Sequence, residues 1–201
     1  MKLYYSQGAC SLSPHIALLE AGLPFDLVKV DLKAKQTENG ENFLEINAKG
    51  YVPALGLDDG TVLTEGPAIL QYIADLKPGL HLAPPAGSRA RYALQEWLNF
   101  ITSELHKPIG SLFNQNMPDS WRHSVTELVG RRLDWVSSQL GEKPYLMNEF
   151  GVADCYLFTV LRWTRYVGIK LNPWPNLVAY MDRMQERSGV THALKTEGIL
   201  K

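Results

Sequence analysis

The sequence has two cysteines, almost no net charge and no apolar run long enough to cross a membrane. Cys10 and Cys155 lie far apart among the 201 residues, which fits a reducing compartment better than a disulfide framework. The formal net charge of −1 provides no basic surface for nucleic acid or a membrane. The chain starts directly with a strand pattern, not with a basic and then apolar leader. We therefore expect a soluble cytoplasmic protein.

Repeats, low-complexity tracts and clusters of metal ligands are also missing from the sequence. The hydrophobic content of 45% is ordinary for a packed globular protein. A chain of this length forms either one large domain or two small ones. We expect no metal site.

The most informative stretch of the chain surrounds Cys10. Residues 3–5 are strand formers, Gly8 interrupts that run, and residues 11–14 are typical of a helix start. Cys10 is therefore expected between a first strand and the N-terminus of a first helix. Backbone N–H groups and the helix dipole favour an anion there, which predicts a lowered pKa for the thiol and a reactive thiolate.

The alternative for Cys10 is a small buried hydrophobic residue, as most single cysteines are. Residues 10–13 form a C-x-x-S motif, in which a hydroxyl replaces the second sulfur of a redox C-x-x-C motif. An oxidised Cys10 would then need an external thiol to release it. The motif therefore suggests a small-molecule thiol as partner.

The N-terminal half reads as alternating strands and helices. A helix over residues 15–21 ends at Gly22, and residues 25–32 alternate as a half-buried strand does. Strand, helix and strand with short joints predict a right-handed βαβ unit with parallel strands. Lys35 follows in a polar stretch, where it is either a solvated loop cation or a contact for an anionic ligand beside the thiol.

A second strand region centres on Pro53, which precedes a strand over residues 54–57. The base rate favours an ordinary trans proline. A cis Val52–Pro53 bond would instead turn the Val52 backbone outward and leave its N–H and C=O unpaired. Such groups can pair with an extended peptide.

A hairpin turn at residues 58–60 predicts an antiparallel strand over residues 61–63 and then a helix that opens at Gly66 and Pro67. The N–H groups at this helix start suit a carboxylate. Glu65 is either an acid that complements the helix dipole or a ligand for an ammonium group.

The second half is expected to be helical, after a Pro- and Gly-rich linker over residues 77–87. A helix over residues 88–106 places Asn99, Ser103 and His106 on one face, which is either its solvated face or a ligand groove. Further helices are expected over residues 119–140, 155–167 and 174–187. Asp154 has the spacing of a capping-box acid and Cys155 the setting of a buried packing residue, so we interpret both as structural.

Five motifs in this order resemble the cytosolic glutathione transferases, and the bacterial beta class in particular. They are YYSQGACSLSPH, NAKGYVPAL, LTEGPAILQYIAD, WLNFITSELHK and GVADCYLFTVLRW, and the resemblance covers nearly the whole chain. It implies an α/β thioredoxin-like N-terminal domain (βαβαββα) and an all-α C-terminal domain. We place these domains at residues 1–77 and 88–201, with a linker over residues 78–87.

The resemblance also implies how each residue contributes. Cys10 would lie beside the glutathione sulfur and form a mixed disulfide with it, and Lys35 would contact the glycine end. Val52, before a cis-Pro53, would pair with the cysteinyl backbone, while Glu65 and Gly66 would bind the γ-glutamyl end. The remaining contacts of the family match Asn99, Ser103, Glu104, Leu105 and His106.

Two positions depart from the family pattern. Many transferases of other classes have serine after the acidic residue, whereas this chain has Gly66, which offers a backbone N–H but no hydroxyl. The helix that carries Asp154 is usually capped by serine or threonine, whereas Gly151 stands here and weakens the cap by at most a few tenths of a kcal/mol.

The resemblance favours a detoxifying enzyme that conjugates glutathione to hydrophobic electrophiles, with thiol–disulfide exchange or reductive dehalogenation through Cys10. Whether Cys10, His106 or water assists the thiolate stays open at this point. The electrophile would bind near Pro108, Phe113 and the helix of Trp163. Glutathione would be a cosubstrate, with no further cofactor, and the family implies a homodimer. A non-catalytic binding module of the same fold is the competing hypothesis.

Overall fold

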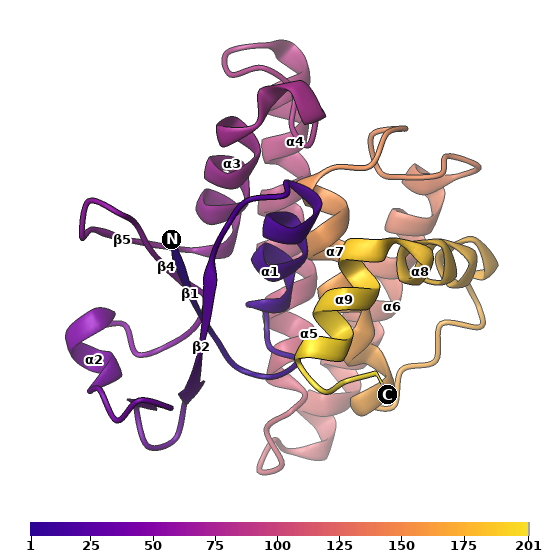
Figure 1. Cartoon of the computed structure of the whole chain (residues 1–201). Helices are drawn as coiled ribbons and strands as arrows, with labels where there is room; N and C mark the ends of the chain where they lie inside the picture. The colour runs from indigo at the N-terminus through magenta and orange to yellow at the C-terminus, as the bar shows by residue number, and fades with distance from the viewer. Residues whose placement is uncertain (201) are drawn as a thin grey trace. The chain divides into compact units, whose positions relative to one another are not determined.

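Most strands of the N-terminal half form at short segments that contain aliphatic or aromatic residues. In the computed structural model, which describes residues 1–200, they build a five-stranded mixed sheet with the order β3-β2-β1-β4-β5 (Figure 1). The strands are β1 (Lys2–Tyr5), β2 (Asp26–Asp31), β3 (Gln36–Thr37), β4 (Ala54–Gly56) and β5 (Val62–Thr64). β1 and β2 are parallel, as predicted, whereas the other pairings are antiparallel.

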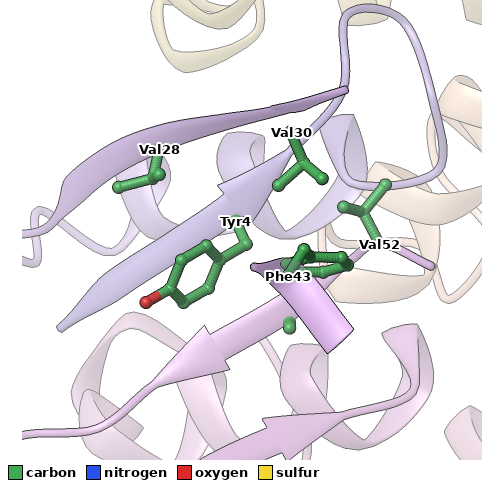
Figure 2. Close-up of a cluster of buried hydrophobic side chains, with 6 residues drawn as sticks. Tyr4, Val28, Val30, Phe43 and Val52 are labelled. Carbon is green, nitrogen blue, oxygen red and sulfur yellow. The ribbon is translucent and has the colours of Figure 1, made fainter. Parts of the chain in front are cut away.

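Helices lie on both faces of this sheet, α1 (Leu12–Glu20) and α3 (Gly66–Leu76) on one face and the short α2 (Phe43–Ile46) on the other (Figure 1). Tyr4 is paired in register with Val28 and Ala54, so all three side chains point to the same face. They form a buried cluster with Val30, Val52 and Phe43 of α2 (Figure 2). This cluster fixes Val52 on the sheet face opposite to α1.

One detail of this half differs from the sequence-based expectation. The polar stretch after β2 contains the short strand β3, which adds a strand to the predicted βαβαββα order because Thr37 is buried and pairs with Val30. α1 begins at Leu12, within the residues 11–14 that the sequence indicates as a helix start. The Val52–Pro53 bond is cis, as the family resemblance implies, although the base rate alone favours trans.

The second half is helical, as predicted. Its elements are α4 (Arg89–Phe100), the π-helical segment η2 (Ile101–His106), α5 (Lys107–Ser111), α6 (Asp119–Leu140), α7 (Val152–Arg162), the 3₁₀ turn η3 (Trp163–Tyr166) and α8 (Pro175–Glu186). The helix expected to end at His106 instead passes through η2 into α5. The π-helical turn changes the spacing of its faces, so the helical-wheel argument does not hold after residue 100.

The last helix, α9 (Ser188–Thr196), lies near the C-terminus, where the sequence patterns led to no prediction. It packs against α1 (Figure 1), where Arg187 forms an ion pair with Glu20. A Cβ atom at Gly189 would lie 2.6 Å from the Glu20 carboxylate, so a side chain there would require the Glu20 side chain to move.

Contacts divide the chain into two compact units, residues 1–83 with 186–201 and residues 84–185. The predicted family domains, residues 1–77 and 88–201, stay a prediction, but α9 is grouped with the sheet. Within residues 1–200, no helix combines the length and apolar character needed to span a bilayer.

Candidate functional site

Cys10 lies two residues before α1, in the position that the sequence predicts. It is a free, partly exposed cysteine, and its Sγ donates a hydrogen bond to the carbonyl oxygen of Val52 at 3.1 Å. Val52 precedes the cis-proline. The expectation that the Val52 carbonyl is unpaired is therefore wrong for this structure, because it accepts a hydrogen bond from the Cys10 thiol.

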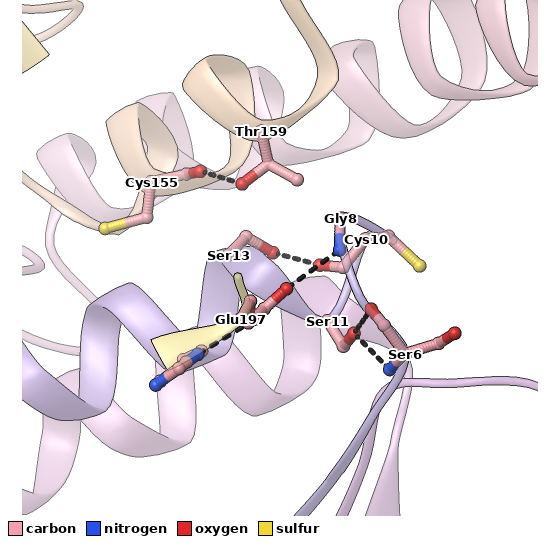
Figure 3. Close-up of polar contacts among 9 residues, drawn as sticks. Ser6, Gly8, Cys10, Ser11, Ser13, Cys155, Thr159 and Glu197 are labelled. Atoms are coloured by element: carbon pink, nitrogen blue, oxygen red, sulfur yellow. Dashed lines mark hydrogen bonds and ion pairs between the residues drawn. The ribbon is translucent and has the colours of Figure 1, made fainter. Parts of the chain in front are cut away.

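The backbone around Cys10 is held by neighbouring hydroxyl groups. Ser13 donates to the Cys10 carbonyl through both Oγ, at 2.8 Å, and its backbone N–H, at 3.1 Å. Ser11 Oγ accepts from the N–H of Ser6 at 3.1 Å and donates to its carbonyl at 3.2 Å (Figure 3). The hydroxyl that replaces the second sulfur of a C-x-x-C motif thus fixes the backbone of Cys10.

A buried carboxylate, Glu197, completes the support of the Cys10 loop. One of its oxygens accepts from the N–H of Gly8 at 2.8 Å, and the other lies 2.9 Å from Nδ1 of His15 (Figure 3). Gly8 has a φ of +68°, a left-handed conformation that suits glycine. Sequence reasoning missed Glu197, because its only signal was an acid in a short amphipathic segment near the C-terminus.

The predicted cation, Lys35, lies beside the segment that contains Val52. Its Nζ donates to the carbonyl oxygen of Gly50 at 2.6 Å. Lys35 has a φ of +55°, an uncommon conformation for a residue with a side chain. The strained turn after β2 thus directs this ammonium group at residues 50–52.

Glu65, at the start of α3, forms an ion pair with an ammonium group of the protein itself. The group is that of Lys49, whose Nζ lies 2.5 Å from Oε1, and Tyr51 donates to the same oxygen at 2.8 Å. These hydrogen bonds raise the pKa values of Lys49 and Tyr51. Sequence reasoning missed both residues, because a lysine and a tyrosine beside a glycine read as an ordinary loop.

Three of the predicted residues therefore converge on three consecutive positions. Lys35 contacts Gly50, Glu65 contacts Tyr51, and Cys10 contacts Val52. A thiol, an ammonium and a carboxylate thus contact residues 50–52. This arrangement suits a short peptide-like ligand with charges of both signs and a sulfur atom.

The other predicted residues lie in the helical unit, Asn99 on α4 and the rest on η2. Ser103 Oγ donates to the Asn99 carbonyl at 3.1 Å, and Glu104 accepts from Nε of Arg132 at 2.7 Å. Asn99 and Ser103 are exposed, whereas the Leu105 side chain is fully buried. The Leu105 side chain therefore belongs to the core of this unit, and a ligand contact there would have to come from its backbone.

His106 is the most perturbed titratable group of this set. Its Nδ1 lies 2.6 Å from the hydroxyl of Tyr156, and Trp163 packs edge-on at 4.8 Å between ring centroids. Burial, with a smaller contribution from Lys107, lowers the pKa of His106 to about 4. The imidazole is therefore neutral at physiological pH.

Aromatic side chains extend from His106 through Trp163 to Phe113 within the helical unit. Phe113 lies 6.2 Å from Trp163 in an edge-to-face arrangement and is 48% exposed. Pro108 follows His106 on α5. These are the residues at which the sequence analysis placed an apolar substrate.

Asp154 and Cys155 have structural contacts. Asp154 is 1% exposed and accepts hydrogen bonds from the N–H groups of Gly151 and Leu146, both at 3.0 Å, and from Tyr180 at 3.1 Å. Cys155 is fully buried. Among residues 1–200, no group of three His, Cys, Asp or Glu side chains is arranged to hold a metal ion.

Known proteins resemble this chain throughout its length. Residues 8–76 match the family model of the glutathione S-transferase N-terminal domain, and residues 119–183 match that of the C-terminal domain. The glutathione S-transferase GstA of Escherichia coli O157:H7 is 46% identical over 200 residues, which cover 99% of this chain and 100% of that protein.

Solved structures agree with this assignment. A bacterial beta class glutathione S-transferase from Sphingomonas chungbukensis has a TM-score of 0.96 and 47% identity, with 100% of both chains covered. A sphingomonad glutathione S-transferase complexed with glutathione has a TM-score of 0.95 and 48% identity, with 99% of this chain and 100% of that chain covered. With its sheet unit, its helical unit and its cysteine at the start of α1, this chain belongs to the glutathione S-transferase family, in its bacterial beta class.

Proposed function

We propose that this glutathione transferase binds reduced glutathione along residues 50–52 and transfers its sulfur to hydrophobic electrophiles, as in detoxification. The convergence of Lys35, Glu65 and Cys10 on this segment carries the proposal. The solved relative that holds glutathione, at 48% identity, supports it.

Each part of glutathione has a chemical counterpart in the sheet unit. The ammonium of its γ-glutamyl group would take the place of Lys49 on Glu65, and its carboxylate would meet the N–H groups at the start of α3, including that of Gly66. Lys35 would bind the glycine carboxylate. The cysteinyl backbone would pair with Val52, which places the glutathione sulfur beside Cys10.

We extend the proposal to the helical unit on the basis of the family resemblance. Asn99, Ser103, Glu104, Leu105 and His106 would contact glutathione, and the electrophile would lie against Phe113 and Trp163. The aromatic side chains would bind an apolar substrate, and the bound geometry would bring the thiolate into contact with it. Glutathione would be the only cosubstrate, and the enzyme would act as a cytoplasmic homodimer.

Cys10 would add a redox reaction to conjugation. Its thiolate attacks the glutathione sulfur of a mixed disulfide R–S–SG, forms Cys10–SG and releases RS⁻. A second glutathione thiolate then attacks Cys10–SG, which gives glutathione disulfide and the free Cys10 thiolate. In reductive dehalogenation, glutathione first displaces halide from R–X. Cys10 then attacks the sulfur of GS–R, the leaving carbanion takes a proton to give R–H, and glutathione regenerates Cys10.

Replacement of Cys10 by alanine tests the division between the two reactions. We expect the Cys10→Ala variant to be retained on immobilised glutathione and to lose disulfide exchange, while conjugation of a generic aryl halide persists at a reduced rate. Replacement of the buried Cys155 by alanine is the matched control and should preserve exchange. Undiminished exchange by Cys10→Ala would show that the role assigned to Cys10 is wrong.

A further inference from the structure

Tyr156 of α7 is a buried residue to which the proposed function gives no role. It is 2% exposed, and its hydroxyl lies 2.6 Å from Nδ1 of His106 on η2. The two rings meet edge to face, with centroids 5.7 Å apart and planes at 82°. The tyrosine is therefore held by packing at one specific nitrogen of the imidazole.

The distance indicates which atom donates this hydrogen bond. Donation by N–H to oxygen typically gives 2.7–3.2 Å between heavy atoms, whereas hydroxyl donors reach about 2.5–3.0 Å. The 2.6 Å separation of Tyr156 and His106 fits a hydroxyl donor. Nδ1 is then the acceptor, and the single proton of the neutral imidazole is on Nε2.

The neighbourhood of the two residues supports this direction. Thr102 Oγ1 lies 3.4 Å from the Tyr156 hydroxyl, but it donates its own hydrogen to the Leu98 carbonyl at 2.7 Å. Thr102 can therefore only accept from Tyr156, and at 3.4 Å it is a poorer acceptor for the single hydroxyl hydrogen than Nδ1 of His106 at 2.6 Å. Burial lowers the pKa of His106 to about 4, so one ring nitrogen is free to accept.

The position of His106 adds to the argument. It is the last residue of η2. π-Helical turns are rare in proteins, and those that occur are often found at functional sites. Trp163, which is 8% exposed, packs edge-on at 72° against the imidazole. Ring rotation by 180° would exchange Nδ1 with a carbon atom and break the Tyr156 bond, so the two aromatic neighbours and the hydroxyl fix one orientation.

We infer that Tyr156 is a positioning residue, whose hydroxyl fixes His106 in the tautomer with the proton on Nε2. This inference rests on the proposed function, in which His106 would contact glutathione, and it takes the sulfur of glutathione as the atom contacted. A neutral imidazole with a proton on Nε2 donates a hydrogen bond to the thiolate sulfur of glutathione. It does not act as the base that removes the proton from the glutathione thiol. His106 is therefore a donor that stabilises the thiolate, and no covalent bond or proton is exchanged.

The tautomer can be measured without an activity assay. Long-range ¹H–¹⁵N NMR of histidine side chains distinguishes protonated from bare ring nitrogens, and a His106→Asn variant assigns the signals. We expect a single Nε2–H form in the unaltered enzyme and a mixture of tautomers in Tyr156→Phe, which retains the ring and loses only the hydroxyl. If Tyr156→Phe also showed only the Nε2–H form of His106, the inference would be overturned.

Kinetics then test whether the tautomer matters. We expect Tyr156→Phe to lower kcat for conjugation about tenfold with little change in KM for glutathione, as for other residues that orient a functional group. In the His106→Asn background the same change should have no further effect. An equal loss in both backgrounds would overturn the inference, since Tyr156 would then act independently of His106.

Tyr180→Phe is the matched control. Tyr180 is also a fully buried tyrosine of this unit, but its hydroxyl donates to Asp154. We expect it to reduce stability and leave the His106 tautomer and kcat unchanged. If the enzyme failed to bind or conjugate glutathione while the NMR result held, the proposed function would fail and the tautomer assignment would stand. Full conjugation by His106→Asn would instead refute the donor role of His106.

Discussion

The Sγ atom of Cys10 lies 3.1 Å from the carbonyl oxygen of Val52, close enough for the thiol to donate a hydrogen bond to it. Only the protonated thiol can make this contact, so the carbonyl favours the neutral form of Cys10. The N-terminus of α1 favours the thiolate, typically by 0.3–1 kcal/mol. Because a thiol is a weak hydrogen-bond donor, we expect the helix start to dominate.

Lys35 provides a direct test of ligand binding. We predict that Lys35→Met raises KM for glutathione about tenfold, because a charge-assisted hydrogen bond contributes roughly 1.5–3 kcal/mol. The side chain of methionine covers a similar area without the charge. Lys33→Met is the matched control, since Lys33 is an exposed residue of the same turn, and its KM should be unchanged. Equal KM values for both variants would contradict the assignment of Lys35.

Glu197 is predicted to stabilise the Cys10 loop from the C-terminal segment. Glu197→Ala removes the acceptor of the Gly8 N–H and the partner of His15 inside the protein. We expect the free energy of unfolding, measured by urea denaturation at fixed protein concentration, to fall by about 2–4 kcal/mol. Glu142→Ala, at an exposed acid, should change it by less than about 0.5 kcal/mol. A similar small change for Glu197→Ala would show that this network is dispensable.

Local signals in the sequence predicted much of the fold. The strand-forming residues of β1, the alternation of β2, the turn at residues 58–60 and the apolar periodicity of α6 are short-range patterns, and the structure confirms these elements. Cys10 could be located for the same reason, because a strand, a glycine and a helix start surround it.

The remaining features depend on contacts between distant residues. Glu197 is 189 residues from Gly8, and Tyr156 is 50 residues from His106. The π-helical turn at η2 is not visible in apolar periodicity, which assumes a regular helix. Lys49 and Tyr51 belong to the site only because the fold brings Glu65 to them.

The low pKa of His106 predicts a specific loss of stability in acid. The native pKa is about 4 and the usual value is 6.5, so the unfolded chain binds more protons between these pH values. The contribution of the neutral imidazole is complete above pH 6.5 and is lost as the pH falls towards 4, by an amount on the order of 3 kcal/mol. Urea unfolding at pH 7.5 and pH 4.5 should show a smaller decrease for His106→Asn than for the unaltered enzyme. Parallel decreases would contradict the pKa.

Asp154 is predicted to stabilise the start of α7. Asp154→Ala leaves the N–H groups of Gly151 and Leu146 without their acceptor, so we expect thermal and urea unfolding to show a loss of about 2–4 kcal/mol. Tyr180→Phe removes only one of the hydrogen bonds to this carboxylate and should cost about 1 kcal/mol. Equal losses for the two variants would show that the helix cap contributes nothing beyond the tyrosine.

The alkylation rate of Cys10 tests the central claim, that a reactive sulfur lies where glutathione binds. Peptide mass spectrometry would follow iodoacetamide labelling at neutral pH, with and without S-methylglutathione, which lacks a free thiol. We predict that Cys10 reacts faster than free cysteine, that the ligand slows its labelling at least tenfold, and that the buried Cys155 stays unlabelled as internal control. Labelling of Cys10 no faster than that of free cysteine, with no protection by the ligand, would contradict the account.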